Sequence, residues 1–336
     1  MLALRAARVG DTLHVRPAIE LLRRALPDAE LTFLCSRYAE AAARGLPIDA
    51  LVPWDHKGRS LEARAQRRAA RARLDQLGPF ELVVGLEDKP WGRALARELG
   101  AEFAAESSWG EHVVERKAGV LVPLGLYDPA RDGPPPPIRW SPTPAARDQA
   151  RAILAQLPRP RVLIQAGSHG SGWLLPPRRR RDPHPRWLAT LARALTRELG
   201  AGIVLQAGLG GREAAASRRL ARGLRLRGAQ VALLEGLDLD ALGGVLSEVE
   251  GVVSANTGPA HLAAAAGTPV VVLEGPSTSA ARPWRAAATT AVLNLGLSCS
   301  PCRGTKHGRT CHVPRCLDGL PVGQVVSALQ VLVAPL

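Results

Sequence analysis

The beginning of the chain alternates short apolar runs with a segment whose apolar residues recur three and four positions apart. Residues 1–5 are apolar, and residues 6–12 form a turn that holds Gly10 and Asp11. From residue 17 to residue 25 the apolar positions fall on one face of a helix, and residues 30–35 are apolar again. The pattern predicts a strand, a turn, a helix and a second strand.

The same alternation continues through most of the remaining sequence. Before residue 127 it predicts strands at 50–53 and 80–86 and helices at 60–77 and 91–99. After residue 144 it predicts strands at 161–165, 202–206, 231–234, 251–254 and 268–273, and helices at 187–199, 213–224, 239–246 and 258–266. Repeated units of this kind indicate an α/β fold, in which helices cover both faces of parallel sheets.

One segment breaks the alternation. Residues 127–144 are rich in proline and have no periodicity, which is typical of a linker. The 336 residues correspond to about two domains. We therefore expect an N-terminal Rossmann-like domain over 1–144, with 127–144 as its linker, and a C-terminal Rossmann-like domain over 145–336. The last helix could pack back on the first domain. Ligands are expected at the carboxyl ends of the strands, in a cleft between the domains.

Composition argues for a soluble protein of the cytoplasm. The longest apolar stretch, 262–273, is shorter than the roughly 20 residues that a spanning helix needs. Arg5, Arg8 and Asp11 interrupt any apolar leader at the start of the chain. We therefore expect neither a membrane span nor a signal peptide.

The formal net charge of +14 favours anionic partners, such as nucleic acid, anionic lipid or nucleotides. Aromatic residues, on which bases stack, make up only 4% of the chain, and no zinc-finger, RRM or KH signature occurs. We therefore expect no nucleic-acid partner.

The most informative segment is 254–261, with the sequence SANTGPAH. It follows an apolar strand and opens an alanine-rich helix, where Asn256 or Thr257 can cap the helix and Gly258 allows close backbone approach. A helix N-terminus of this kind binds anions, and His261 lies in its first turn. The alternative is a capped structural helix with a solvated histidine.

Three further segments carry candidate chemistry. Asp11 follows the first strand, where a carboxylate would face the cleft, or would act only as a helix cap. The loop 167–172 (GSHGSG) holds Ser168 and could cradle a phosphate or be a plain surface loop. The arginine run 178–181 reads either as an anion clamp or as a solvated charge run.

A cysteine cluster follows near the C-terminal end. Its spacing is C-x2-C-x8-C-x4-C, which can form a tetrahedral structural zinc site, whereas disulfides are disfavoured in a reducing cytoplasm. Free cysteines are the other alternative. The four residues are Cys299, Cys302, Cys311 and Cys316.

Together these segments resemble glycosyltransferase family 9, the ADP-heptose:lipopolysaccharide heptosyltransferases. The start, LRAARVGDTLHVRPAIELLRRALPDAELTFLC, is similar to the family's opening strand, GD turn and helix. The segment SANTGPAHLAAAAGTPVVVLEGPS is similar to its signature S-x-D-T-G-P-x-H-L-A-A-x-x-G-T-P, and the cysteine pattern also matches. The resemblance covers most of the chain in the right order.

The resemblance implies a GT-B fold, with two Rossmann-like domains facing each other across a cleft. It implies an inverting transfer of heptose from ADP-heptose to the lipopolysaccharide inner core, with no metal or other cofactor required. Asp11 would be the general base. Arg5, Arg8, His14 and Arg16 would bind the acceptor. Ser168, Leu237, Asn256, Thr257, Gly258 and His261 would bind the donor, with Leu237 near the adenine.

Two departures from the family pattern bear on the donor. The family's Asp in the DTGP motif is Asn256 here, which removes a charge expected to hold sugar hydroxyls. The family usually also carries a lysine in a K-x-W-like context, but no lysine lies between Lys117 and Lys306. Arg186 or Arg181 is the candidate replacement, although arginine and lysine differ in geometry.

The acceptor implied by the resemblance is a lipid-linked oligosaccharide in an anionic leaflet. The arginines of the first domain, including those of 64–73, would then attach the enzyme peripherally to the inner face of a Gram-negative inner membrane. Two alternatives stay open. One is a GT-B glycosyltransferase with another donor or acceptor. The other is a non-catalytic protein that binds a nucleotide-sugar or polyanion.

Overall fold

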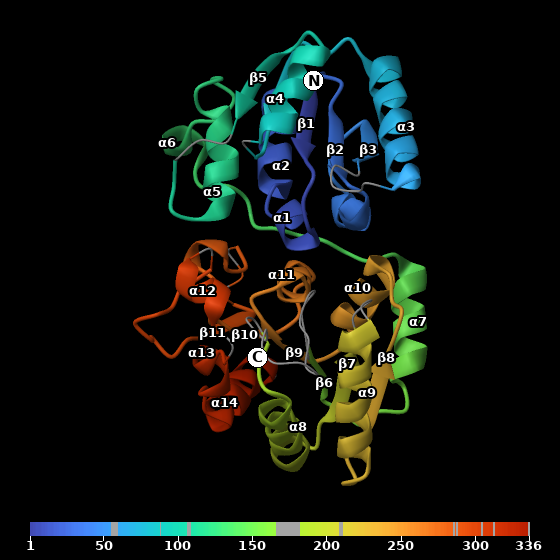
Figure 1. Cartoon of the computed structure of the whole chain (residues 1–336), viewed down its shortest axis with the longest axis vertical. Helices are drawn as coiled ribbons and strands as arrows, with labels where there is room; N and C mark the ends of the chain where they lie inside the picture. Colours follow the sequence, from blue (N-terminus) through green and yellow to red (C-terminus); the bar gives the residue numbers. More distant parts are fainter. Residues whose placement is uncertain are drawn as a thin grey trace. The chain divides into compact units, whose positions relative to one another are not determined.

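The computed structural model divides the chain into two compact units, Met1–Trp140 and Ser141–Leu336 (Figure 1). The boundary lies inside the proline-rich segment, four residues before the predicted end of the first domain. The described residues are 1–54, 60–87, 89–105, 109–165, 182–207, 211–284, 286, 288–303, 305–311 and 313–334.

The first unit is built on a parallel sheet of five strands in the order β3-β2-β1-β4-β5. Leu4 on β1 lies opposite Leu34 on one neighbour and Gly85 on the other, so β1 is central. The outer strand β3 contains Pro53, which pairs in register with Cys35. The strands are β1 (Leu2–Arg5), β2 (Thr32–Ser36), β3 (Ala50–Trp54), β4 (Leu82–Gly85) and β5 (Glu102–Ala105).

Both faces of this sheet are covered. Leu2 and Leu4 of β1 pack on one face with buried residues of α3 and α4, whereas Ala3 points to the other face with residues of α2. This burial explains why the strands read as continuous apolar runs. The helices are α1 (Val9–Leu13), α2 (Arg16–Ala25), η1 (Arg37–Ala43), α3 (Leu61–Leu77), α4 (Pro90–Glu98), α5 (Val113–Ala118), η2 (Gly119–Leu121) and α6 (Pro129–Asp132).

The second unit holds a parallel sheet of six strands in the order β11-β10-β9-β6-β7-β8. Its central pair is β6 and β9, where Ile164 lies opposite Val253. The strands are β6 (Arg161–Ile164), β7 (Gly202–Gln206), β8 (Val231–Leu234), β9 (Gly251–Ala255), β10 (Val270–Leu273) and β11 (Thr290–Leu293).

Helices also cover this sheet. Buried residues of α8, α9 and α14 share one core, and α14 packs on α8 and on β9, β10 and β11. On α10, Gly244 is required because an added Cβ would lie 2.3 Å from the Ala146 carbonyl oxygen of α7. The helices are α7 (Pro144–Leu154), α8 (Pro185–Leu199), α9 (Gly211–Arg225), α10 (Leu239–Glu248), α11 (Gly258–Ala265), η3 (Ser279–Ala281), α12 (Lys306–Thr310), α13 (Arg315–Asp318) and α14 (Val322–Val333).

The prediction of two parallel α/β sheets is confirmed, and the proline-rich segment proves to be more ordered than a linker. Tyr127 is buried, and its hydroxyl donates to the Gly133 carbonyl at 2.6 Å. Trp140 is also buried, and its indole N–H donates to the Ala41 carbonyl at 2.8 Å. Most of the segment is therefore part of the first unit.

Among the described residues, no helix combines the length and the apolar character needed to cross a bilayer.

Candidate active site

Each sheet has a point at which the strand order reverses. In the first unit β1 leads to β2 on one side, whereas β4 lies on the other side of β1. In the second unit β6 leads to β7 on one side, and β9 lies on the other side. Open parallel sheets bind ligands at such switch points, beyond the carboxyl ends of the strands. The predicted site residues can therefore be located relative to β1/β4 and to β6/β9.

Asp11 lies at the first switch point. The short helix α1 begins four residues after β1 and carries Asp11 in its middle, with 39% of the side chain exposed. Arg5, the last residue of β1, places one guanidinium nitrogen 3.3 Å from the Asp11 carboxylate. The same guanidinium donates to Glu87, just beyond β4, at 2.8 Å. One buried cation therefore joins the ends of the two strands and the predicted base.

The other three residues expected to bind the acceptor lie in different environments. Arg8 is the N-cap of α1 and is exposed. His14 is buried, and its ring meets that of His112 edge to face at a centroid distance of 5.9 Å.

Arg16 has a structural position. It is only 4% exposed, and its guanidinium donates to the backbone carbonyls of Ala42 and Arg44 at 2.9 and 2.8 Å. Burial lowers the pKa of Arg16 to about 10. Arg5 is similarly engaged inside the unit, so the structure leaves exposed Arg8 as the arginine of this group best placed to meet a ligand.

The second switch point carries the segment that resembles the family signature. Ser254 is fully buried on β9, where its hydroxyl donates to the Ala255 carbonyl at 2.8 Å and lies 3.3 Å from the Thr257 hydroxyl. Thr257 is the N-cap of α11, but its hydroxyl donates backwards to Ala255 at 3.2 Å instead of capping the helix. Within the described residues, the N-terminal end of α11 is thus left without a side-chain cap, which suits an incoming anion.

Asn256 stands out at this end of β9. Both its amide nitrogen and its amide oxygen are inaccessible to solvent, and neither has a hydrogen-bond partner among the described residues. Leaving buried polar atoms unsatisfied costs about 1–3 kcal/mol each. His261 lies in the first turn of α11 and is 8% exposed. Asn256 therefore presents two polar atoms whose bonding capacity is not used within the described chain.

The other residues predicted to bind the donor lie outside the described residues or in a loop at the sheet edge. Ser168, Arg181 and the rest of the arginine run lie outside the described residues. The chain enters that region at Gln165, whose N–H donates to the Val253 carbonyl at 2.9 Å, directly at the β6/β9 switch point. Leu237 is half-buried in the loop after β8, at the carboxyl edge of the same sheet.

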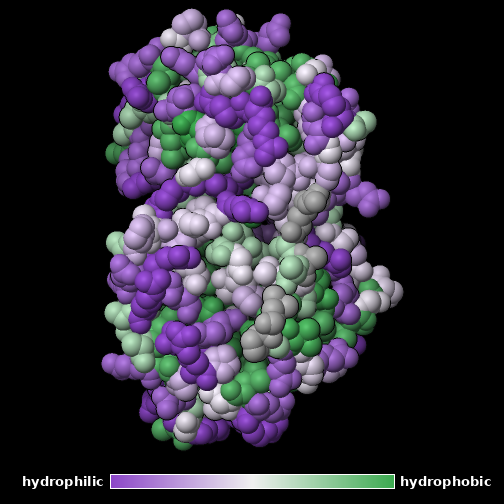
Figure 2. Space-filling model, turned by 180° about the vertical axis from the view of Figure 1, so that it is seen from behind, coloured by the Kyte–Doolittle hydropathy of each residue, from purple (hydrophilic) through white to green (hydrophobic). Residues whose placement is uncertain are grey.

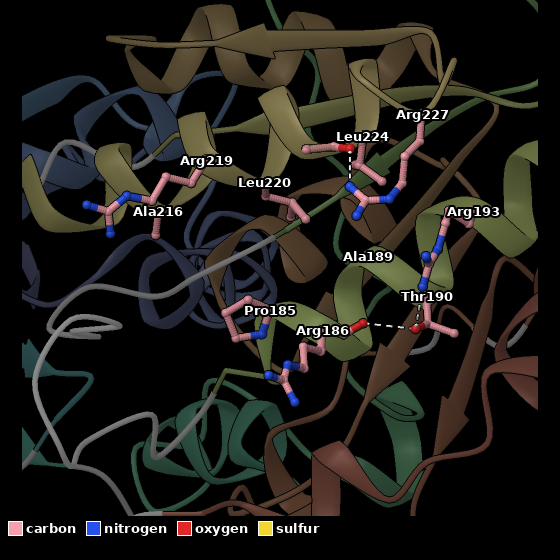
Figure 3. Close-up of a pocket in the computed structure, with 11 residues that line it drawn as sticks. Pro185, Arg186, Ala189, Thr190, Arg193, Ala216, Arg219, Leu220, Leu224 and Arg227 are labelled. Carbon is pink, nitrogen blue, oxygen red and sulfur yellow. Dashed lines mark hydrogen bonds between the residues drawn. The ribbon is translucent and has the colours of Figure 1, made fainter.

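A cavity of about 580 Å³ lies between α8 and α9 (Figure 3). Its floor includes Ala216, Leu220 and Leu224, and four exposed arginines line it: Arg186, Arg193, Arg219 and Arg227. The two helices cover a face of the sheet. Arg186, one of the two candidate replacements for the family lysine, therefore belongs to this groove.

The cysteine cluster lies in the second unit, in the segment that follows β11 and in α13, which contains Cys316. Cys302 and Cys316 are buried, and burial raises the pKa of both thiols, that of Cys316 to about 11. Cys311 is half-buried, and its thiol donates to the Val313 carbonyl at 3.4 Å. In the part of the chain that the structure describes, no three His, Cys, Asp or Glu side chains are grouped so as to hold a metal ion. The zinc site therefore stays a prediction.

Sequence reasoning missed Glu87 and His112. Glu87 lies 82 positions from Arg5, so their contact depends on β4 lying beside β1, which no local pattern states. The signal that could have identified Glu87 was its position as an acidic residue directly after the apolar run 80–86.

Comparisons with known proteins agree with this architecture. The model of glycosyltransferase family 9 (heptosyltransferase) matches residues 93–311. Lipopolysaccharide heptosyltransferase 1 of Pseudomonas aeruginosa is 26% identical over 331 residues, which cover 90% of this chain and 85% of that protein.

Two solved structures are similar over nearly the whole chain. A family 9 glycosyltransferase from Veillonella parvula has a TM-score of 0.77 at 20% identity and covers 99% of this chain and 96% of its own. The E. coli heptosyltransferase WaaC with ADP has a TM-score of 0.67 at 18% identity and covers 98% and 99%. The fold is thus that of the heptosyltransferases, and the chain belongs to glycosyltransferase family 9.

Proposed function

We propose that this glycosyltransferase moves a heptose from ADP-heptose to the inner core of lipopolysaccharide, with inversion and without a metal ion. The observation that carries the proposal is Asp11 at the β1/β4 switch point, part-exposed and ion-paired to Arg5. The solved E. coli relative holds ADP, and the P. aeruginosa relative is named for lipopolysaccharide. Both names support this donor and this acceptor.

Asp11 acts as the general base. An acceptor hydroxyl attacks the anomeric carbon, and Asp11 accepts its proton as the new carbon–oxygen bond forms. The bond from the anomeric carbon to the diphosphate oxygen breaks, and its electron pair leaves with ADP. Attack from the face opposite the leaving group inverts the anomeric carbon. A carboxylate is a weak base, so its contribution lies in its position.

The end of β9 and the start of α11 stabilise the leaving diphosphate. The N–H groups at the helix N-terminus point towards an anion, and the Thr257 hydroxyl can turn away from the Ala255 carbonyl to donate to it. Gly258 permits close approach of the backbone, and His261 adds a ring nitrogen in the first turn. We assign Ser168, which lies outside the described residues, to the same diphosphate, and Leu237 to the adenine.

Asn256 favours a second candidate, a family 9 transferase for a different sugar. An amide both donates and accepts, whereas the family's carboxylate only accepts, so the two recognise different patterns of hydroxyl groups. The missing lysine supports the same alternative.

Calorimetric titration with ADP, UDP and GDP in the absence of metal tests the donor. Selective binding of ADP is expected. Preference for UDP or GDP would indicate a donor sugar of another class. Equal affinity for all three nucleotides would contradict recognition of the adenine.

We place the enzyme in the cytoplasm, attached peripherally to the inner face of the membrane that contains its lipid-linked acceptor. The net charge of +14 supports electrostatic attachment. On the face shown in Figure 2, hydrophilic residues are spread over both units, and hydrophobic residues form groups among these hydrophilic residues.

A further inference from the structure

The buried pair of Arg5 and Glu87 has no assigned role in the transfer. Both side chains are nearly inaccessible, at 10% and 8% exposure, and they lie at the ends of the two strands that form the first switch point. Replacing a buried ion pair with apolar residues of similar volume is often neutral or stabilising. Stability alone therefore does not explain why this pair lies beside Asp11.

The guanidinium is shared unequally between two carboxylates. Arg5 donates a hydrogen bond to Glu87 at 2.8 Å. Its contact with Asp11, at 3.3 Å, is an ion pair and not a hydrogen bond. Glu87 is buried, but 39% of the Asp11 side chain is exposed. Glu87 thus anchors the cation, and Asp11 keeps an accessible carboxylate beside it.

We infer that Arg5 and Glu87 are positioning residues that hold Asp11 in place and balance its charge as it takes up the acceptor proton. The inference rests on the proposed role of Asp11 as base. With Asp11 ionised, one cation faces two carboxylates. With Asp11 protonated, Arg5 and Glu87 remain a neutral pair, so proton transfer leaves no buried charge without a partner.

Glu87 and Asp11 contact different nitrogens of the same guanidinium. The contact with Glu87 is the shorter one, at 2.8 Å against 3.3 Å for Asp11. Glu87 therefore fixes the orientation of Arg5, and Arg5 in turn fixes the position of the Asp11 carboxylate.

The other titratable groups around α1 do not replace this contact. Among the described residues, Arg5 is the one cation within ion-pair distance of Asp11. Of the charged residues on η1, which packs against α1, Arg37 pairs with Glu62, and Glu40 is the other. The remaining groups near α1 are Arg8, His14, Arg16 and His112. Asp88 lies outside the described residues.

Two variants should shift the pH profile of transfer in opposite directions. Glu87→Gln keeps the size and the acceptor oxygen for Arg5 but gives Arg5's charge to Asp11 alone. The acid limb of kcat should move down by about half to one pH unit. The double variant Arg5→Met with Glu87→Met removes both charges together, so the acid limb should move up by a similar amount. In the double variant, which also loses the positioning contact, kcat at pH 7 should fall roughly ten- to a hundredfold with KM for the donor unchanged.

Asp49→Asn serves as a matched control, because Asp49 pairs with Arg23 in the same unit at 2.5 Å. It should leave the pH profile unchanged. The ¹³C signal of the Asp11 carboxyl carbon, assigned by its loss in Asp11→Asn, follows the same titration without any substrate. It also reports on variants whose turnover is too slow to measure.

The outcomes separate the inference from the proposed function. If Asp11→Asn is inactive but neither variant moves the acid limb or the ¹³C titration, Arg5 and Glu87 are structural and the inference fails. Shifts of both variants in the same direction would also overturn it. If Asp11→Asn keeps full turnover, the proposed base itself is wrong.

Discussion

The two switch points of this molecule have the same topology and different chemistry. At β1/β4 the polar groups are charged and already engaged with one another, through the guanidinium of Arg5. At β6/β9 the side chains of Ser254, Asn256 and Thr257 are neutral, and both amide atoms of Asn256 have no partner among the described residues. In the proposed function, the charges at the first switch point serve proton transfer. The second has polar capacity that a ligand can satisfy.

This difference in charge is consistent with the groups that each site is proposed to bind. A diphosphate carries negative charge, so N–H groups and hydroxyls at β6/β9 attract it. A base needs negative charge of its own, together with a cation that fixes it. The contrast predicts that changes at the first point alter turnover and changes at the second alter donor binding.

The largest expected effect comes from Asp11→Asn. This change keeps the shape of the side chain and removes the proton acceptor. Transfer should fall by about 10²–10⁴-fold, the usual contribution of general base catalysis. Calorimetric ADP affinity should stay at the wild-type value, because ADP is assigned to the second unit. Loss of ADP binding in this variant would contradict the proposal that the first unit supplies the base and the second binds the donor.

The next largest effect is expected on membrane attachment, and the experiment tests which unit supplies the binding surface. Arg64, Arg68 and Arg73 on α3 are exposed, and each contributes up to ~1 kcal/mol near an anionic surface. Changing all three to Gln should weaken salt-sensitive binding to anionic vesicles by roughly tenfold or more. Flotation or co-sedimentation at two salt concentrations measures it.

The matched control changes three exposed arginines of the second unit to Gln: Arg219 and Arg222 on α9, and Arg227 two residues beyond its end. It removes the same charge from the second unit, and vesicle binding should stay close to wild type. An equal loss in both triple variants would show that net charge alone drives binding. Binding that does not respond to salt would contradict electrostatic attachment.

The smallest effect concerns Asn256. Asn256→Ala removes an amide that makes no hydrogen bond within the described chain, so thermal stability should change little. Affinity for the sugar nucleotide should fall about tenfold, the equivalent of one lost hydrogen bond at 1.4 kcal/mol. Ser254→Ala is the comparison, because its hydroxyl is buried and bonded to Ala255. It should lower stability by about 1 kcal/mol and alter donor affinity less. The reverse ranking would mean that Asn256 is structural.

Much of the architecture follows from periodicity. The elements for which no bounds were predicted include two long helices, α7 with 11 residues and α14 with 12, and several elements too short to show a period. The strands β5 and β11 have four residues each and lie at sheet edges, where apolar runs are weak. The helix α1 has five residues, which is too few for an amphipathic pattern. The helices α3, α4, α8, α9, α10 and α11 and the central strands were predicted close to their observed bounds.

The candidate site divides in the same way. Asp11 and the segment 254–261 could be recognised because each directly follows a strand, so local sequence places them at the carboxyl edge. The partners of Asp11 could not be recognised, because strand order brings Glu87 to Arg5. The contacts of Arg16 were also hidden. The resemblance assigned this residue to the acceptor, whereas in the structure it donates to two backbone carbonyls.

Pro53 has a consequence for how the molecule behaves among copies of itself. It lies in β3, the outermost strand on one side of the first sheet. An edge strand exposes a row of backbone donors and acceptors that another chain can extend. Proline has no N–H to offer, so it interrupts that row midway. The edge is a poor template for a further strand, which protects a cationic, arginine-rich protein from building sheets across molecules when it is concentrated at a surface.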